Sequence, residues 1–416
     1  MKIEIEDYGM NAEGVGKIDG KVVLVANALV GEIVDCSIEK DFGNYAAAKI
    51  NEIVKPSNNR VDEKCVHCKV CGGCNLMHMN YDEQLKFKQT LVKKTIKKIA
   101  KIDINVSETV GSKRFNYRNK MSFSVGGGNC GLKGRSSDDI FNIDTCSLTS
   151  ETINIILNLF KQSGFAYNEN VKNLVVRELS NQVLVGVVVK RELDLTKFLN
   201  ALKQINREIG LFQVVNQRKD SVVLDGKVIH VGGIKKIKVE NFGLTYYIDL
   251  MGFHQTNIEI QNKIYERVLS FISDNESVVN GFSGQGLLSA VLATKAKHVT
   301  GIEINKYSHQ SAEELKKSNS IHNLTNICGD FHKHIIHINK ANTIILDPTK
   351  KGCGSQVMHE IKRFDNIIYI SCNPIALAKD LRELLDTYDI ESVTPFDMFP
   401  NTLSVETVVK LRRKGE

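Results

Sequence analysis

The chain has 416 residues, of which 42% are hydrophobic and 25% charged, a composition typical of a globular protein with two or three domains. No apolar stretch approaches the roughly 18 residues that cross a bilayer, and the first seven residues are too acidic for a signal peptide. We therefore expect a cytoplasmic monomer with no membrane partner. In a reducing cytosol its ten cysteines suit metal binding or catalysis better than disulfide formation.

Residues 1–55 are predicted to form a small β-barrel. Apolar and polar residues alternate in short runs, and Asp19-Gly20 is a tight hairpin signal. The predicted strands cover residues 2–6, 16–18, 21–25, 32–38 and 47–54. Five strands in so short a span indicate a closed, OB-like barrel of the kind that often binds an oligonucleotide. A linker follows over residues 55–64.

Four cysteines, Cys65, Cys68, Cys71 and Cys74, fall within ten residues. Two zinc knuckles need a longer spacer than the two residues between Cys68 and Cys71. Iron–sulfur sites of the ferredoxin type take three cysteines from a compact run and one from elsewhere. By chemistry alone, that fourth ligand is either Cys130 or Cys146. The pattern therefore favours an iron–sulfur site, with zinc as the alternative.

A basic segment lies over residues 83–120, where eleven Lys and Arg residues oppose three acidic ones for a net charge of +8. Such a stripe is typical of polyanion binding. The alternative is that residues 83–101 form an amphipathic helix whose lysines are simply solvated. The stretch Ser112-Lys-Arg-Phe-Asn-Tyr-Arg-Asn-Lys120 interleaves aromatics with cations, which suits stacking on bases beside phosphate contacts. We therefore expect RNA as the partner.

Two further domains are predicted after the barrel. Residues 56–245 hold the cysteine run, the basic segment and a mixed α+β region with helices near 150–162 and 194–205. Residues 246–416 alternate strand and helix regularly, which predicts an α/β, doubly wound, Rossmann-like sheet. Its predicted strands are 277–282, 298–304, 325–327, 343–347, 366–370 and 406–411, and its predicted helices are 286–295, 308–322, 355–363 and 375–386. Ligands should bind at the carboxyl ends of these strands.

A glycine turn, Phe282-Ser-Gly-Gln-Gly286, follows the first strand of this sheet. Gly284 and Gly286 let the backbone approach a nucleotide, and Glu303, 19 residues past Gly284, is placed to accept hydrogen bonds from ribose hydroxyls. Ser289 stands where a dinucleotide fingerprint has its third glycine. The turn therefore suits S-adenosylmethionine better than NAD.

Two other strand ends carry reactive side chains. Asp347 follows the fourth strand, and Cys372 follows the fifth in Ile370-Ser-Cys-Asn-Pro374. Pro374 stops the strand and starts a helix, which places the thiol at the ligand crevice. A buried structural cysteine is the alternative, but this position suits a nucleophile.

These residues resemble the RNA (uracil-5-)-methyltransferases over almost the whole chain. The barrel resembles the RNA-binding TRAM module, and Cys65-x5-Cys71-Gly-Gly-Cys74 with Asp144-x-Cys146 resembles the family's iron–sulfur segment. Five further stretches match the family's methyltransferase motifs in order and spacing: Phe253-His-Gln-Thr-Asn257, Phe282-Ser-Gly-Gln-Gly286, Asp347-Pro-Thr-Lys-Lys-Gly-Cys353, Ser371-Cys-Asn-Pro374 and Phe399-Pro-Asn-Thr-x-x-Val-Glu-Thr407. The resemblance implies a class I, S-adenosylmethionine-dependent methyltransferase domain.

The resemblance also implies roles for single residues. Cys372 would be the nucleophile that adds to C6 of uracil, and Glu406 the base that removes the C5 proton. Five residues would contact the cofactor or the target base: Gln255, Phe282, Glu303, Asp330 and Asp347. Four cysteines would hold a [4Fe-4S] cluster: Cys65, Cys71, Cys74 and Cys146. Cys68 is then an extra thiol.

The chain departs from the family's pattern at three places. Asn280 stands where an aspartate is usual, Thr349-Lys350 where the family has Pro-Arg, and Ser404 where a histidine is common. Cys372 and Glu406 match the family's catalytic residues, so we expect an active enzyme that makes 5-methyluridine. The expected substrate is 23S ribosomal RNA. Three alternatives are transfer RNA as substrate, methylation of a base amine, and an RNA-binding assembly factor with weakened catalysis.

Overall fold

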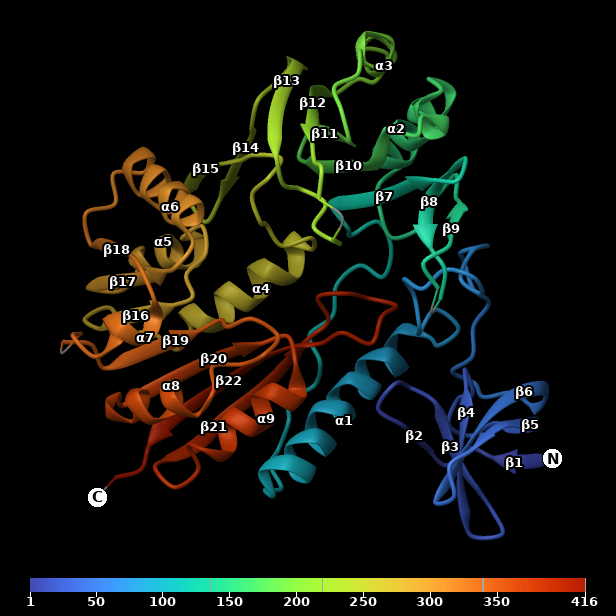
Figure 1. Ribbon diagram of the computed structural model, residues 1–416. Coiled ribbons are helices and arrows are strands. Elements are labelled where there is room, and N and C mark those ends of the chain that lie inside the picture. Colours follow the sequence, from blue (N-terminus) through green and yellow to red (C-terminus); the bar gives the residue numbers. More distant parts are fainter. Residues whose placement is uncertain (136, 219, 339, 416) are drawn as a thin grey trace.

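The computed structural model describes residues 1–135, 137–218, 220–338 and 340–415. A small barrel, a central domain and a larger α/β domain follow one another along the chain, and helix α1 (Tyr81–Ala100) lies against the α/β domain (Figure 1). Among the helices of the described residues, none combines the length and the apolar character that crossing a membrane requires.

The barrel is built from six strands rather than the predicted five. They are β1 (Lys2–Glu4), β2 (Asp7–Tyr8), β3 (Gly14–Ile18), β4 (Lys21–Ala26), β5 (Ile33–Asp41) and β6 (Tyr45–Lys55), in the order β1-β5-β6-β4-β3-β2. The Glu6 N–H, in the link between β1 and β2, donates to the Val15 carbonyl of β3 at 2.9 Å, and β1 comes close to β3. Gly16 makes that approach possible, because a Cβ there would lie 2.4 Å from the Glu4 carbonyl oxygen.

The central domain is a seven-stranded mixed sheet covered by two helices on one face. Its order is β13-β12-β11-β10-β7-β8-β9, and only the β11–β12 pair is parallel. The strands are β7 (Lys120–Gly126), β8 (Asn129–Lys133), β9 (Ile140–Asn142), β10 (Val171–Leu179), β11 (Gln182–Val189), β12 (Glu208–Val215) and β13 (Lys227–Gly233); the helices are α2 (Glu151–Gln162), η1 (Phe165–Tyr167) and α3 (Thr196–Leu202). Phe160 of α2 meets Phe198 of α3 edge-on at 5.3 Å, which seals the core between them.

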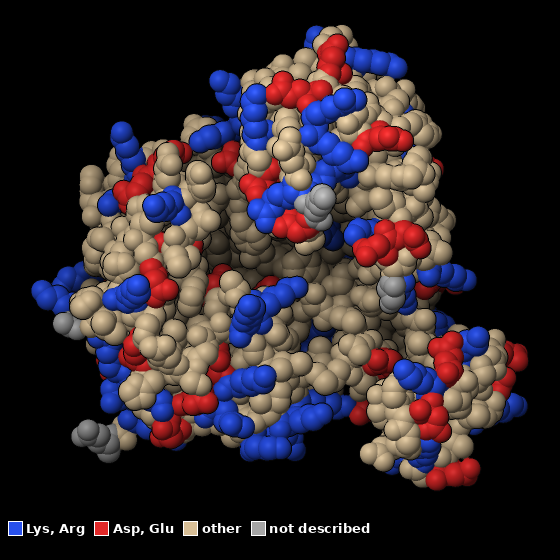
Figure 2. Space-filling model, viewed as in Figure 1, with Lys and Arg blue, Asp and Glu red and all other residues tan. Residues whose placement is uncertain are grey.

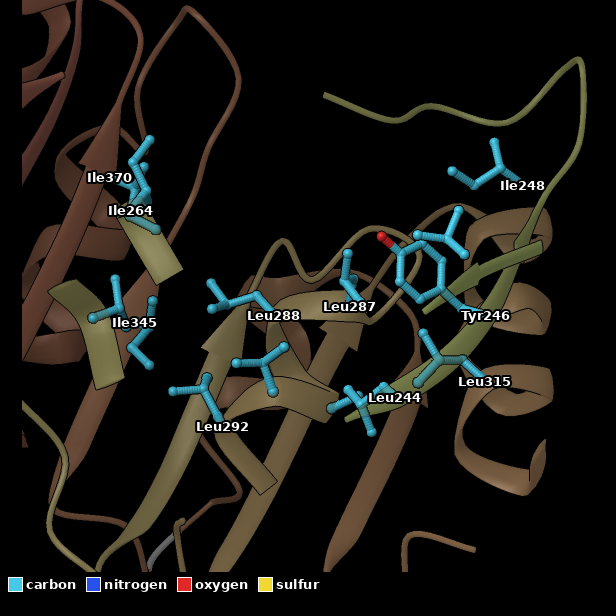
Figure 3. Close-up of a cluster of buried hydrophobic side chains, with 14 of the residues drawn as sticks. Leu244, Tyr246, Ile248, Ile264, Leu287, Leu288, Leu292, Leu315, Ile345 and Ile370 are labelled. Carbon is cyan, nitrogen blue, oxygen red and sulfur yellow. The ribbon is translucent and has the colours of Figure 1, made fainter. Parts of the chain in front are cut away.

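A short antiparallel ribbon, β14 (Ile237–Asn241) and β15 (Leu244–Ile248), connects the central and α/β domains. Its buried side chains belong to the core of the α/β domain, where Leu244 and Tyr246 lie near Leu287 and Leu315 (Figure 3). The domain boundary expected between residues 245 and 246 therefore falls inside β15.

The α/β domain is a seven-stranded sheet with the order β18-β17-β16-β19-β20-β22-β21. Strands β16 to β20 are mutually parallel and β22 is antiparallel to both of its neighbours. The strands are β16 (Ser277–Gly281), β17 (His298–Glu303), β18 (Leu324–Cys328), β19 (Thr343–Leu346), β20 (Asn366–Ser371), β21 (Tyr388–Phe396) and β22 (Glu406–Arg413). The helices are α4 (Ile258–Leu269), α5 (Leu287–Ala293), α6 (Lys306–Ser318), α7 (Phe331–Ile335), α8 (Ser355–Glu360), η2 (Ile361–Arg363) and α9 (Pro374–Arg382). This is the predicted doubly wound, Rossmann-like fold.

Helix α1 covers one face of this sheet beside α9. Val92, Ile96 and Ala100 of α1 share a buried core with Leu377 and Leu381 of α9. Lys88, which the basic-segment hypothesis counted among the RNA-binding cations, is fully buried and pairs with Asp397 at 2.5 Å. The inward face of the predicted basic helix thus has a structural role, and only its outer lysines can meet a polyanion.

Candidate active site

One large cavity, of about 990 Å³, lies at the carboxyl ends of the parallel strands. Figure 2 shows the molecule hollowed at its centre, between the central and α/β domains. All of the predicted catalytic and cofactor-binding residues line this cavity except Gly286: Gln255, Phe282, Gly284, Glu303, Asp330, Asp347, Cys372 and Glu406. Residues from the ends of β16, β17, β18, β19 and β20, from the start of β22 and from one loop therefore meet in a single space.

Cys372 lies where β20 ends, one residue after Ser371. Pro374 is the first residue of α9, and the Asn373 side chain caps that helix by accepting from the Ile375 N–H at 3.1 Å. The same side chain donates to the Lys350 carbonyl at 2.9 Å. Burial, followed by the nearby Glu406 carboxylate, raises the pKa of the Cys372 thiol, while Lys350 lowers it.

Glu406 is the first residue of β22 and is 8% exposed. Burial raises its pKa to about 8; Asp347 acts in the same direction and Lys350 in the opposite one. Asp347 faces the cavity, yet protein surrounds it closely enough that burial raises its pKa to about 7. Cys372, Asp347 and Glu406 are thus close enough to influence one another electrostatically, with Lys350 as the opposing cation.

The glycine turn after β16 has the backbone that its sequence predicts. Phe282, Gly284 and Gly286 all adopt positive φ, at 59°, 54° and 79°. The Gly284 N–H donates to Oε2 of Glu303 at 2.9 Å, which fixes the turn to the end of β17. A Cβ on Gly286 would lie 2.6 Å from Cβ of Ala312, so this glycine serves the packing of α6 rather than the cavity.

Several cavity residues were not predicted. Gln261, Ile264 and Tyr265 come from α4, a helix absent from the predicted elements. Its signals are present in the sequence: Asn257 caps it, and Ile260, Ile264 and Val268 recur every four residues on its buried face. Gly73, Asn75 and Arg118 come from the cysteine run and basic segment, and no local pattern predicts that they reach the cavity.

Three buried polar atoms on cavity-lining residues have no hydrogen-bond partner within the described part of the chain: Arg118 Nε, Gln261 Nε2 and Asn280 Oδ1. Asn280 is 1% exposed and donates from its Nδ2 to Ser289 Oγ at 2.8 Å, which leaves its oxygen free to accept. Buried polar groups are nearly always satisfied. The cavity wall is therefore suited to a polar ligand.

A second, small pocket is lined by Met77, Leu132 and Leu148 and by five cysteines: Cys65, Cys68, Cys71, Cys74 and Cys146. Burial raises the pKa of Cys71, Cys74 and Cys146, and neighbouring thiolates act in the same direction. Those neighbours are Cys65, Cys71 and Cys146, and Cys65 also acts on Cys68. Cys68 bonds Glu63 at 2.6 Å, and burial and Glu63 together raise the pKa of its thiol to about 12.

Among the described residues, no group of three or more His, Cys, Asp or Glu side chains is arranged to hold a single metal ion. All ten cysteines are free thiols. The donor set around this pocket, cysteine thiols from the run of residues 65–74 and from Cys146, fits an iron–sulfur cluster in its chemistry.

The sequence suggested that the aromatic residues of the segment 112–120 stack on bases. In the structure these residues are engaged by the protein itself. Tyr117 is buried and its hydroxyl donates to the Pro400 carbonyl at 3.2 Å. Phe115 lies against Lys64 and Arg114, at 4.7 and 5.2 Å from its ring centroid. The segment holds two domains together, and its exposed cations are what it can offer to RNA.

Comparison with known families gives two matches that together cover most of the chain. The model described as tRNA (Uracil-5-)-methyltransferase matches residues 80–329 and 332–414, and the TRAM domain model matches residues 1–50. An uncharacterized RNA methyltransferase of Clostridium acetobutylicum is 33% identical, over 99% of this chain and 97% of its own length. A similar protein of Clostridium tetani is 30% identical, over 99% and 96%.

Among solved structures, the chain resembles the Pyrococcus abyssi tRNA (uracil-54, C5)-methyltransferase in complex with S-adenosyl-L-homocysteine. The TM-score is 0.80 at 23% identity, and the match covers 99% of this chain and 100% of that one. At this identity the likeness shows the fold, and it extends over the barrel, the central domain and the α/β domain alike.

Proposed function

Because the chain belongs to the tRNA (uracil-5-)-methyltransferase family, we propose that it transfers a methyl group from S-adenosylmethionine to C5 of uracil in RNA. The observation that carries the proposal is the meeting of Cys372, Glu406 and Asp347 in one cavity, at the ends of three neighbouring strands. A methyltransferase acting on a base amine needs no thiol there. Uracil C5 is a weak nucleophile, and a thiol adding to C6 is what activates it.

The reaction divides between the two predicted catalytic residues. The Cys372 thiolate adds to C6, and the electron pair of the C5–C6 double bond moves towards C5 and O4. C5 then takes the methyl group. Glu406 removes the remaining C5 proton, the C5–C6 double bond forms again, and the Cys372 thiolate leaves. The products are 5-methyluridine and S-adenosylhomocysteine, and the C5 proton stays on Glu406 until solvent takes it up.

The residues present fit S-adenosylmethionine, which when bound supplies an electrophilic methyl group on a positively charged sulfur. Gly284 and Phe282 form the turn, and Glu303 and Asp330 place carboxylates on the wall. Asn280 Oδ1, which has no partner among the described residues, would accept from a polar group of the cofactor. A cluster of acceptors suits a cationic ligand. The target uridine must leave its stack to reach Cys372, so it lies in a loop or is flipped out.

The Cys372 mechanism can be tested with RNA that carries 5-fluorouridine. Fluorine cannot leave C5 as a proton does, so we expect a covalent complex that survives a denaturing gel. Cys372→Ala should form none. Cys328→Ala is the matched control, because Cys328 is exposed and lies at the end of β18 outside the cavity. Methyl transfer to ordinary RNA without any trapped complex would refute this mechanism.

We infer that Cys65, Cys71, Cys74 and Cys146 hold a [4Fe-4S] cluster. Their position around one pocket supports the choice, as does the hydrogen bond of Cys68 with Glu63. The test is iron and sulfide content with the broad absorption near roughly 400 nm. Cys146→Ser should lose both, whereas Cys68→Ser and Cys130→Ser should keep them. Stoichiometric zinc in place of iron would overturn the assignment.

We propose 23S ribosomal RNA as the substrate, from the resemblance of the cysteine run and barrel to ribosomal RNA members of the family. Transfer RNA is the second candidate, because a tRNA (uracil-54, C5)-methyltransferase shares this architecture over 99% of the chain. Purified 23S RNA and tRNA, each offered with labelled S-adenosylmethionine, distinguish the two. Label in tRNA alone would reject the ribosomal assignment.

A further inference from the structure

The loop of residues 397–405, which leads directly into Glu406, is held by hydrogen bonds from three segments far away in the sequence. Lys88 of α1 donates to the Phe399 carbonyl at 3.2 Å. Tyr117 donates to the Pro400 carbonyl at 3.2 Å, and Asn257 to the Met398 carbonyl at 3.2 Å. The position of the proposed base therefore depends on contacts outside its own strand.

Asn401 is the centre of this loop's contacts. It is fully buried, and its φ of 67° is one that asparagine tolerates better than most residues. Its Oδ1 accepts from Arg114 Nε at 2.8 Å and Gln84 Nε2 at 3.2 Å, and its Nδ2 donates to the Arg114 carbonyl at 2.9 Å. Its N–H donates to Gln84 Oε1 at 2.9 Å. Each polar group of Asn401 is thereby engaged.

The cysteine run reaches the same residue through its backbone. The N–H groups of Asn75 and Leu76 both donate to the Asn401 carbonyl, at 2.9 and 3.0 Å. Asn75 directly follows Cys74 and lines the catalytic cavity, as Gly73 does. Asn401 in turn precedes Glu406 by five residues. One buried asparagine thus connects the cysteine run to the loop that carries the base.

Cys372 follows Ser371, which pairs with Thr407 of β22, but among the described residues it makes no hydrogen bond to the 397–405 loop. It lies between β20 and α9, where Asn373 fixes its backbone to the Lys350 carbonyl. A displacement of the 397–405 loop should therefore move Glu406 and leave the nucleophile in place. Proton transfer needs hydrogen-bond distance, and a misplacement of about 1 Å can slow a step by about 10²-fold.

We propose that Asn401 is a positioning residue through which the cysteine run holds Glu406 in place for removal of the C5 proton. The inference rests on the proposed function, since it assigns Asn401 to one step of that reaction. Losing this contact slows release of the methylated base from Cys372 more than formation of the adduct. The covalent protein–RNA complex then accumulates on ordinary uridine.

The test compares Asn401→Gly with Asn216→Gly in the full-length protein. Glycine accepts the positive φ of residue 401 and keeps its backbone bonds. Asn216 is a matched control: it is 1% exposed and donates to the Val222 and Val223 carbonyls at 2.8 and 2.9 Å, away from the cavity. Methyl transfer and gel-stable complex are measured with ordinary RNA.

We expect Asn401→Gly to slow multiple-turnover release of 5-methyluridine by about 10- to 100-fold and to raise the fraction of covalent complex above that of the wild type. Asn216→Gly should change neither. Tyr117→Phe removes a single hydrogen bond to the same loop and should show the same signature more weakly, which keeps the test open if Asn401→Gly fails to fold. A slower rate without accumulation, or an unchanged rate, would overturn the inference.

Cys74→Ser tests the other end of the connection. Because Cys74 adjoins the Asn75 contact, this variant should also accumulate the complex. The double variant with Asn401→Gly should lose little more than the worse single variant, since the two changes break one connection. Fully additive losses would reject the connection between the cysteine run and Asn401, but not the proposed function. Failure of the wild type to methylate any uridine would instead reject the proposed function.

Discussion

Lys350 is the cation that acts on both proposed catalytic groups. It lowers the pKa of Cys372 and of Glu406, against burial and the neighbouring carboxylates that raise them. Catalysis needs the thiolate of one and the carboxylate of the other, so both must lose a proton. Because both pKa values are raised, the active form increases as the pH rises through about 8 for Glu406. Lys350 brings that range closer to neutrality.

We predict that Lys350→Met moves the rising limb of the pH–rate profile to higher pH and lowers the rate at pH 7 by at least about tenfold, because both groups must lose a proton. The measurement is kcat/KM between pH 6.5 and 9. Lys351→Met is the control, because Lys351 is the exposed neighbour and does not line the cavity. Coincident profiles for Lys350→Met and the wild type would show that this charge does not tune the site.

The sequence predicts the place of Cys372 and Asp347 in the cavity, because each follows a strand whose end is visible in the pattern; their reactivity stays a prediction. Cys372 and Asp347 come directly after apolar runs, and the doubly wound fold brings such ends together. Gly73, Asn75 and Arg118 escape prediction because they reach the cavity from a different domain. Their position depends on tertiary packing, which no short pattern records.

At the scale of elements, the two glycines of the turn between β16 and α5 have separate roles. A Cβ at Gly284 would meet no atom within 4 Å, whereas one at Gly286 would collide with Ala312. We predict that Gly286→Ala lowers the stability by about 2–4 kcal/mol, from backbone strain and overpacking. Gly284→Ala should lose only about 1 kcal/mol but weaken S-adenosylhomocysteine binding. Thermal unfolding and calorimetric titration measure the two effects, and equal destabilisation by both variants would contradict this division.

The buried pair of Lys88 and Asp397 ties α1 to the loop before Glu406. Burial lowers the pKa of Lys88, and Asp397 acts against that shift. Lys88→Met strands a buried carboxylate, so we predict a loss of about 3–5 kcal/mol, most of which Lys88→Met with Asp397→Leu regains. Urea unfolding measures the change in the free energy of unfolding. Circular dichroism is the probe, because the chain has no tryptophan for fluorescence.

Lys97→Met is the matched control for that pair. Lys97 lies on the same helix and bonds Asp103 at 2.6 Å, but both side chains are exposed, and such surface pairs contribute little. An equal loss of stability in both single variants would mean that burial of the Lys88–Asp397 pair is irrelevant. Failure of the double variant to recover would mean that the pair itself, rather than the stranded charge, stabilises the contact.

The predicted elements fail where packing overrides local pattern. Strand β21 was not predicted: a register irregularity between Ile390 and Ser392 interrupts its alternation, and Glu391 places a charge at the break. The basic helix was placed correctly within two residues, but its buried Lys88 was assigned to the solvent face. A lysine is predicted to be exposed from sequence alone unless its buried partner is known. The partner of Lys88 is 309 residues away.

At the scale of the whole molecule, charge is distributed unevenly between the parts expected to meet RNA. The barrel, residues 1–55, carries six lysines against ten acidic residues, a net charge of −4, whereas residues 83–120 carry +8. The barrel is therefore unsuited to bind phosphates by charge alone. It exposes instead the rings of Phe42 and Tyr45, stacked at 4.7 Å on the hairpin between β5 and β6, with Lys40 over Phe42 at 4.9 Å.

These two surfaces should respond differently to salt. Replacing the exposed Lys86, Lys98 and Lys113 by methionine should lower the slope of log affinity against log salt by about 1 per lysine, because each contact with a phosphate releases a counterion. Phe42→Ala with Tyr45→Ala should weaken RNA binding by about 5- to 100-fold at each salt concentration and leave the slope unchanged, because stacking on bases releases no ions. Fluorescence anisotropy with a labelled RNA measures both.

Tyr167→Ala is the control for the aromatic pair, since Tyr167 is 71% exposed on the central domain and should not change the affinity. A flatter slope in the aromatic variant would mean that the hairpin acts through Lys40 and its neighbours. Unchanged affinity would mean that the barrel does not contact bases. In that second case the +8 segment and the cavity would carry RNA recognition, and the barrel would serve to hold α1 through Asp7, which bonds Lys94 at 2.5 Å.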